Sequence, residues 1–277
     1  MDGGAADGPA RGPGAGCLML PVQCALGAGS GVLVGFTLGL VGGGGSILAV
    51  PLMVYLVGIT SPHVAIGTSA LAVAGNAAAG LVNHARCGTV KWRCGLMYAA
   101  AGVAGALAGS ALGKRFDGQK LLLLFALVMV AVGILMLRGR RDQGQPGAEC
   151  TRANAPQVMG YGLATGTFSG FFGIGGGFLI VPGLVGSTGM PTLNAVGTSL
   201  VAVMAFGLTT AASYAASGLV DWTLALVFVV GGAFGSTLGT TSARRLAGTA
   251  GRLTTVFAVL IFAVAAYMIV RGLQALA

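Results

Sequence analysis

Charged side chains are the residue class that this sequence lacks most. Only 8% of the 277 residues are charged, against roughly 25% in typical soluble domains, and the mean hydropathy is +0.90. No charged residue stands in the middle of an apolar segment, and the acids fall in tails, loops or segment ends: Asp2, Asp7, Asp117, Asp142, Glu149 and Asp221. The scarcity of charge predicts a polytopic membrane protein. It disfavours a cation site, a carboxylate proton relay and an enzyme, which needs a nucleophile, a base and an acid.

Paired cysteine motifs are absent as well. The chain has five scattered cysteines without C-x-x-C spacing, mostly in or beside apolar segments: Cys17, Cys24, Cys87, Cys94 and Cys150. We therefore expect neither a disulfide framework nor a metal site or cofactor, and we interpret these cysteines as small apolar residues. The net charge of +9 does not indicate nucleic-acid binding, because the basic residues lie in short loops that set membrane topology.

Apolar segments occupy most of the chain and predict an all-α fold. Their lengths follow the order long, short, long, long, long, and this order occurs twice. The ten segments lie near residues 22–41, 47–58, 64–84, 93–113, 120–137, 157–172, 177–188, 195–215, 222–243 and 253–270. We divide the chain into a disordered N-terminal tail (1–20), a first membrane repeat (21–138), a polar linker loop (139–156) and a second membrane repeat (157–273).

Two glycine-rich stretches, each ending in a proline, identify the repeat. Residues 39–51 read GLVGGGGSILAVP, and residues 170–182 read GFFGIGGGFLIVP. The triplet Gly-Thr-Ser at 67–69 recurs at 197–199, and Trp92 has its counterpart in Trp222. Chance similarity between glycine-rich segments does not preserve both tryptophans and both triplets. The sequence therefore predicts two homologous halves, as in many transporters.

The basic residues indicate how the halves are oriented. If each short segment forms a hairpin with the long segment before it, each half makes an odd number of passes and the second half is inverted. Loops 85–93, 138–156 and 244–252 then share one side, which carries ten of the fifteen basic residues. The alternative is a parallel arrangement in which each long segment and the short one after it form a single broken span. It places nine basic residues on one side and six on the other. The positive-inside rule favours inverted repeats with both termini outside.

The glycine stretches predict a binding site inside the membrane. Non-helical backbone at membrane depth is tolerated only where protein or a water-filled cavity surrounds it. A helix that restarts there, at Ser46 or Gly177, presents free N–H groups and a partial positive charge to an anion. We expect the backbone donors to be Gly42, Gly44, Gly45, Ser46, Gly173, Gly175, Gly176 and Gly177. The alternative is that these glycines serve only close helix packing.

Few other polar residues interrupt the apolar segments. Four hydroxyls stand early in equivalent helices, where they either donate to an anion or bond to a carbonyl one turn back: Thr68, Ser69, Thr198 and Ser199. Asn76 lies mid-helix, where it lines the path or bonds to another helix, and the equivalent residue is Phe206. His84, at a helix end, is a candidate proton carrier or an ordinary interfacial histidine.

The doubled glycine motif resembles that of a known family. The stretches GLVGGGGSILAVPLM and GFFGIGGGFLIVPGL, each followed by A-[IV]-G-T-S and G-x-V-x-W, are similar to the sulfite exporter TauE/SafE family of bacterial membrane proteins over residues 25–272. One departure is that Gly43 in the first copy corresponds to Ile174 in the second. Family members are described with seven or eight spans, so ten segments fit only if the short ones are re-entrant.

The resemblance implies a function. We expect a transporter or exporter of small sulfur-containing anions, such as sulfite, thiosulfate or sulfoacetate, in the bacterial cytoplasmic (inner) membrane. The expected partners are that anion and the lipid bilayer, and homo-oligomers are left open. The alternatives are a transporter of a neutral or other small solute, and a non-transporting membrane assembly subunit.

Overall fold

The computed structural model describes residues 21–138, 150–151, 153–173, 177–245, 259, 261–271 and 274, and these residues form helices and short connections. The predicted tail 1–20 and most of the predicted linker 139–156 lie outside them. The elements are α1 (Pro21–Val41), η1 (Gly42–Leu48), α2 (Ala49–Pro51), η2 (Leu52–Leu56), α3 (Pro62–Arg86), α4 (Trp92–Gly113), α5 (Gly118–Arg138), α6 (Ala155–Phe172), α7 (Gly177–Thr188), α8 (Thr192–Ala215) and α9 (Trp222–Arg245). A further helix, Ile261–Arg271, follows. The prediction of an all-helical chain is confirmed.

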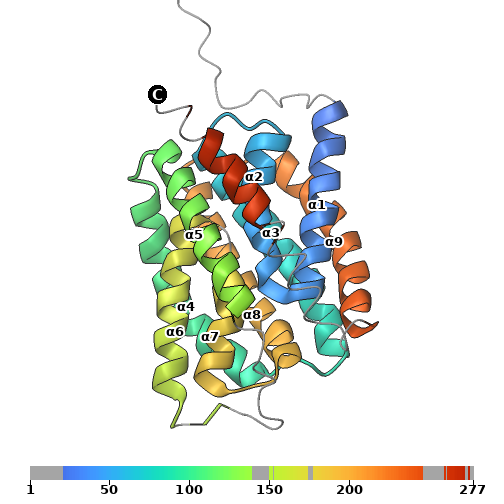
Figure 1. Ribbon diagram of the computed structural model, residues 1–277, viewed down its shortest axis with the longest axis vertical. Coiled ribbons are helices and arrows are strands. Elements are labelled where there is room, and N and C mark those ends of the chain that lie inside the picture. The colour runs from blue at the N-terminus through green and yellow to red at the C-terminus, as the bar shows by residue number, and fades with distance from the viewer. Residues whose placement is uncertain are drawn as a thin grey trace, which may run out of the picture.

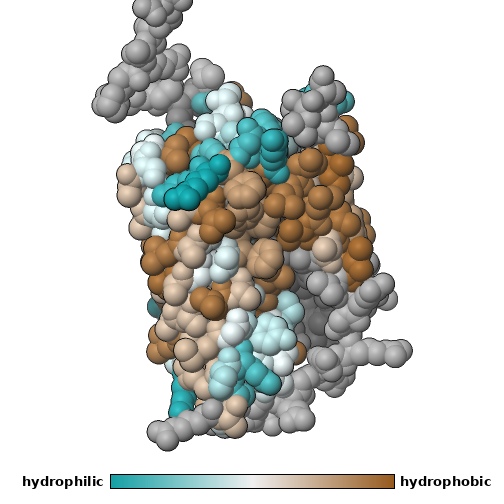
Figure 2. Space-filling view, turned by 90° about the vertical axis from the view of Figure 1, so that its left-hand side faces the viewer, coloured by the Kyte–Doolittle hydropathy of each residue, from teal (hydrophilic) through white to brown (hydrophobic). Residues whose placement is uncertain are grey.

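Among the residues that the structure describes, five helices are long and apolar enough to cross a membrane: α1, α3, α4, α8 and α9. Shorter apolar helices accompany them, among them Leu179–Thr188 and Ile261–Arg271. On the face drawn in Figure 2, apolar side chains cover the middle and hydrophilic ones gather toward the two ends. Trp92 and Trp222, the first residues of α4 and α9, are exposed, as expected of anchors at a membrane interface. The chain is a multi-pass membrane protein.

Helices α3 and α8 form the centre of the bundle. They pack against each other, and 72% of the apolar window of each is buried, against 44% for α1, α4 and α9. Helix α1 packs mainly against α9, and α4 against α6. In Figure 1, α1 begins at the upper end and α6 at the lower end, so the hairpins that these helices open enter from opposite ends.

Glycines bring the backbones of α1 and α9 into direct contact. Every fourth residue of α1 from Gly27 to Gly39 faces every fourth residue of α9 from Leu224 to Ser236, so the two helices run parallel. A Cβ atom at Gly31 or Gly35 would collide with the carbonyl oxygen of Phe228 or Gly232. Water cannot drive helix association within a bilayer, so this close backbone approach is what holds the pair together.

Helices α4 and α6 form the same kind of contact. A Cβ atom at Gly166 would collide with the carbonyl oxygen of Gly102, and one at Gly109 with that of Thr167. Gly166 and Gly102 correspond, at offsets of 131 and 130, to Gly35 and Gly232 of the α1–α9 pair. These reciprocal contacts support the predicted duplication, which itself stays a prediction.

The first glycine stretch is helical, which corrects the expectation of a loop that ends at Ser46. Residues Gly42–Leu48 form a 3-10 helix directly after α1, and the chain continues through α2 into a π-helical turn at Leu52–Leu56. Pro51 lacks an N–H, so it interrupts the regular hydrogen-bond pattern where α2 ends and the π-helical turn begins. The second stretch follows the prediction more closely, since α7 begins at Gly177 and contains Pro182.

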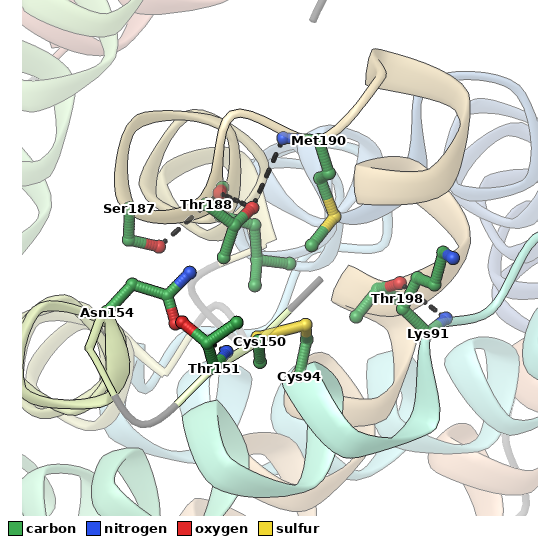
Figure 3. The surroundings of a disulfide bond; sticks show 10 residues. Lys91, Cys94, Cys150, Thr151, Asn154, Ser187, Thr188, Met190 and Thr198 are labelled. Carbon is green, nitrogen blue, oxygen red and sulfur yellow. Dashed lines mark hydrogen bonds between the residues drawn. A yellow bond between two sulfur atoms is a disulfide. The ribbon is translucent and has the colours of Figure 1, made fainter. Parts of the chain in front are cut away.

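A disulfide joins Cys94 and Cys150, so the interpretation of all five cysteines as unpaired was wrong. The two residues are 56 positions apart, but the packing of α4 against α6 brings their Cα atoms to 5.3 Å (Figure 3). Cys150 lies near the start of α6 and Cys94 in the first turn of α4, so both lie at the lower end of Figure 1. This is the end that the charge count places inside the cell, whereas disulfides persist mainly in oxidising compartments.

Substitution of Gly35 tests the contact between α1 and α9. Gly35→Val should destabilise the protein by about 3 kcal/mol or more, because its Cβ meets backbone that cannot move aside. Gly29→Val is the matched control: it lies on the same helix, and a Cβ there has no atom within 4 Å. Size-exclusion profiles and thermal unfolding in detergent measure both. Equal stability of the two variants would contradict the proposed role of the contact.

Labelling of Cys87 tests which end of the bundle faces the inside of the cell. This free, exposed cysteine lies between α3 and α4, at the end that carries the disulfide. We expect a membrane-impermeant maleimide to reach it only after permeabilisation, because charge bias sets orientation during insertion, before any disulfide forms. The Cys94–Cys150 pair would then be reduced in the cell. Labelling of intact cells would reverse both conclusions, and a Cys87→Ser variant gives the background.

Candidate functional site

The two glycine stretches meet inside the bundle. Element η1, which contains Gly42, Gly44, Gly45 and Ser46, packs against α7, which begins at Gly177. The structure thus brings together segments that are 131 residues apart in the sequence. Gly175 and Gly176 lie outside the described residues. The meeting of the breaks is the geometric requirement for one shared site.

Packing explains two of the glycines directly. A Cβ at Gly45 would collide with the backbone of Thr37 and Leu38 on α1, so η1 folds back tightly against that helix. Gly173 ends α6 in the left-handed conformation, with φ +68°, and a Cβ there would collide with Ile66. Glycine is the residue that adopts this conformation without strain. The packing alternative therefore accounts for these two positions, and ligand binding needs further support.

Thr68 and Thr198 hold the starts of two distant helices. The Thr198 hydroxyl accepts a hydrogen bond from the backbone N–H of Lys91, which caps α4, at 2.9 Å (Figure 3). The Thr68 hydroxyl accepts one from the backbone N–H of Asp221, just before α9, also at 2.9 Å. Both threonines are fully buried. These two hydroxyls thus join the central helices to the helix starts of α4 and α9.

Ser69 and Ser199 bond within their own helices. Ser69 donates to the carbonyl of Ile66 at 2.9 Å, and Ser199 donates to that of Val196 at 2.7 Å. This is the second of the two arrangements that the sequence left open. The Ser69 hydroxyl also lies 3.5 Å from the carbonyl oxygen of Gly173, so it stands beside the second glycine break.

Asn76 is the largest unsatisfied polar group of the site. Its side chain is fully buried, and neither the nitrogen nor the oxygen of its carboxamide has a hydrogen-bond partner. A Cβ at Gly232 would collide with this carboxamide, so Asn76 packs directly on the backbone of α9. Buried amides are normally paired, and an unpaired one costs about 1–3 kcal/mol.

His84 is buried between α1 and the connection that follows α3. Its Nε2 atom lies 3.4 Å from the carbonyl oxygen of Gly39, and its Nδ1 atom lies 3.0 Å from Oγ1 of Thr89. Asn76, Gly80 and His84 follow at intervals of four residues, so they share one face of α3. The ring therefore stands at the lower end of the same row as Asn76.

A cavity of about 280 Å³ lies away from the glycine breaks. Its lining comprises Val90, Lys91, Trp92, Arg93, Cys94 and Cys150. It holds two basic residues and the disulfide, and sequence reasoning missed it, because only the fold brings Cys150 to the start of α4. Its place at the start of α4 makes it part of the rim of the bundle, not of a site between the breaks.

Comparisons with known proteins show which family the chain resembles. The family model "Sulfite exporter TauE/SafE" matches residues 27–268. A protein of Xylella fastidiosa (strain 9a5c), described as a probable membrane transporter protein, is 53% identical over 252 residues, which cover 88% of this chain and 94% of the relative. The probable membrane transporter protein YunE of Bacillus subtilis (strain 168) is 28% identical over 239 residues, 78% of this chain and 87% of YunE. No solved structure matches the chain significantly.

The fold and these relatives together define the class of protein. A multi-pass helical bundle with two glycine breaks, similar over most of its length to transporters, is a membrane transporter and not an enzyme. Because the family model covers most of the chain, the protein belongs to the sulfite exporter TauE/SafE family.

Substitution of the two capping threonines tests their structural role. Thr68→Val and Thr198→Val should each destabilise the protein by about 1–3 kcal/mol, because a backbone N–H loses its acceptor. Thr68→Ser and Thr198→Ser keep the hydroxyl and should stay near the parent. Thr209→Val is the control, since that hydroxyl donates only to its own helix. Thermal unfolding in detergent measures all five variants. Parent-like stability of both Thr68→Val and Thr198→Val would contradict this role.

Proposed function

We propose that this protein transports small sulfur-containing anions, such as sulfite, thiosulfate, sulfoacetate or related organosulfonates, across the bacterial cytoplasmic membrane. The observation that carries the proposal is the packing of η1 against α7, which joins the two glycine breaks inside a chain of the TauE/SafE family. The substrate would bind near the midplane, between these breaks.

Backbone groups and hydroxyls can hold an anion there without a charged side chain. The first N–H groups of α7 have no acceptor within the helix itself, and they lie at the positive end of its dipole. Pro182, inside α7, leaves a carbonyl unpaired one turn earlier, which adds polarity to the lining. The candidate backbone donors are Gly42, Gly44, Gly45, Ser46, Gly173, Gly175, Gly176 and Gly177, and the candidate side chains are Thr68, Ser69, Thr198, Ser199 and Asn76.

A site of this kind favours release as well as binding. A buried lysine or arginine would hold an anion strongly, whereas neutral donors exchange its hydration shell for hydrogen bonds of similar strength. His84, at the lower end of the Asn76 row, is the residue we propose for any proton-linked step. A transporter of neutral solutes is the second candidate, and the absence of charged residues from the middle of the apolar segments is what favours it.

A thermal-shift screen tests the substrate class. The purified, full-length protein in detergent is heated with sulfite, thiosulfate, sulfate, sulfoacetate, taurine or chloride at equal ionic strength. A ligand at 100 times its dissociation constant should stabilise the protein by about 2.7 kcal/mol. We expect one or two sulfur anions to do so and chloride not to. No response to any anion, with a response to a neutral solute, would contradict the proposal.

Flux into proteoliposomes completes that test. Ser46→Ala and Ser69→Ala, each next to a glycine break, should lower uptake of the stabilising anion. Thr209→Ala is the matched control, because it removes a half-buried hydroxyl that bonds within α8. Equal flux through all three variants would contradict the proposal that the glycine breaks line the substrate path.

A further inference from the structure

A second unsatisfied polar group lies beside Asn76. The hydroxyl of Ser236, on α9, is fully buried and has no hydrogen-bond partner. It stands 3.0 Å from the position that a Cβ of Gly80 would occupy, and Gly80 follows Asn76 by one turn on α3. Gly232, which touches the Asn76 carboxamide, precedes Ser236 by one turn on α9. The two groups therefore line one seam between α3 and α9.

This seam lies at the depth of the first glycine break. Gly35 of α1 contacts Gly232, the residue against the Asn76 carboxamide. Only two and three residues further along α1, Thr37 and Leu38 contact Gly45. That offset is a rise of about 3 to 5 Å along a helix. Since α2, which follows η1, packs on α3, the break and the carboxamide belong to one neighbourhood.

The corresponding seam in the other half is filled. At an offset of 130, Asn76 corresponds to Phe206 and Gly232 to Gly102, and Phe206 packs directly on Gly102. The residue that corresponds to Ser236 is Ala106, which is buried. Phe206 and Ala106 pack closely at these two positions without polar atoms, so packing does not require the carboxamide of Asn76 or the hydroxyl of Ser236. The other half has its own buried hydroxyl without a hydrogen-bond partner, at Thr210, which corresponds to Gly80.

We propose that Asn76 and Ser236 are specificity-determining residues, which select a solute that carries a hydrogen-bond donor as well as its anionic oxygens. This inference rests on the proposed transport of sulfur anions. The Asn76 nitrogen donates to an oxygen of the anion, and the Asn76 oxygen accepts from an O–H or N–H group. Ser236 serves as either donor or acceptor.

The two ends of the Asn76 carboxamide require a ligand with both an acceptor and a donor. A fully deprotonated oxyanion offers acceptors alone, so the carboxamide oxygen of Asn76 stays unpaired when such an anion binds. A protonated monoanion such as hydrogensulfite, or a sulfonate with a hydroxyl or amino group, satisfies both ends. Sites built to hydrogen-bond a group discriminate strongly against analogues that lack it.

Two ligands that differ by one hydroxyl group test the proposal. Binding of 2-hydroxyethanesulfonate and ethanesulfonate to the full-length protein is compared by thermal shift and by competition with the stabilising anion. We expect the parent to bind the hydroxylated ligand about 10 to 100 times more tightly, the range for one buried hydrogen bond. Asn76→Leu should abolish this preference and weaken binding of both ligands, because 2-hydroxyethanesulfonate loses hydrogen bonds to both ends of the carboxamide and ethanesulfonate loses the one from its nitrogen.

Two further variants keep the test decisive. Phe206→Leu changes the equivalent position of the other half and should keep the full preference. Ser236→Ala installs the residue found at the equivalent position 106, so it should fold even if Asn76→Leu does not, and it should reduce the preference several-fold.

The outcomes separate the two proposals. If the parent binds both sulfonates equally, or if Ser236→Ala and Asn76→Leu keep the parental preference, the selectivity role is overturned while anion transport stands. An ordered water on Asn76 alone would give that result. If neither sulfonate binds and no sulfur anion stabilises the parent, the proposed function itself fails.

Discussion

Direct contact between helix backbones is the interaction on which this structure depends. A bilayer offers no hydrophobic drive to bring apolar helices together, so surfaces must fit closely. Glycines at every fourth position of α1 face the carbonyl oxygens of α9, and glycines of α4 and α6 do the same. These two pairs flank α3 and α8, and they leave little freedom in where the glycine breaks can lie.

The sequence predicted the helices well because hydropathy is a strong signal in membrane proteins. Helix α7 has the predicted bounds, 177–188, and α4 and α8 begin within three residues of the predicted starts. The 3-10 form of Gly42–Leu48 could not be predicted in this way. It follows from the tight return of Gly45 onto Thr37 and Leu38, a contact between segments whose relative position only the fold sets. The Cys94–Cys150 disulfide has the same origin.

The candidate site could be predicted by location but not by role. The sequence left two roles open for Thr68 and Thr198, donation to an anion or a bond to a carbonyl one turn back, and the structure shows a further one: their hydroxyls accept hydrogen bonds from the starts of distant helices. A hydroxyl is both donor and acceptor, so its partner is decided by what the fold places next to it. Asn76 was singled out because a carboxamide is rare in mid-span. That neither of its polar atoms has a partner depends on the helix opposite and could not be read from the sequence.

The reciprocal threonine bonds have a mechanical consequence. Thr68 of α3 holds the start of α9 at the upper end, and Thr198 of α8 holds the start of α4 at the lower end. A rocking motion can break one of these hydrogen bonds at one membrane surface and leave the other, at the opposite surface, intact. The two ends differ in charge, however, because the helix start held by Thr198 carries Lys91 where the helix start held by Thr68 carries Asp221.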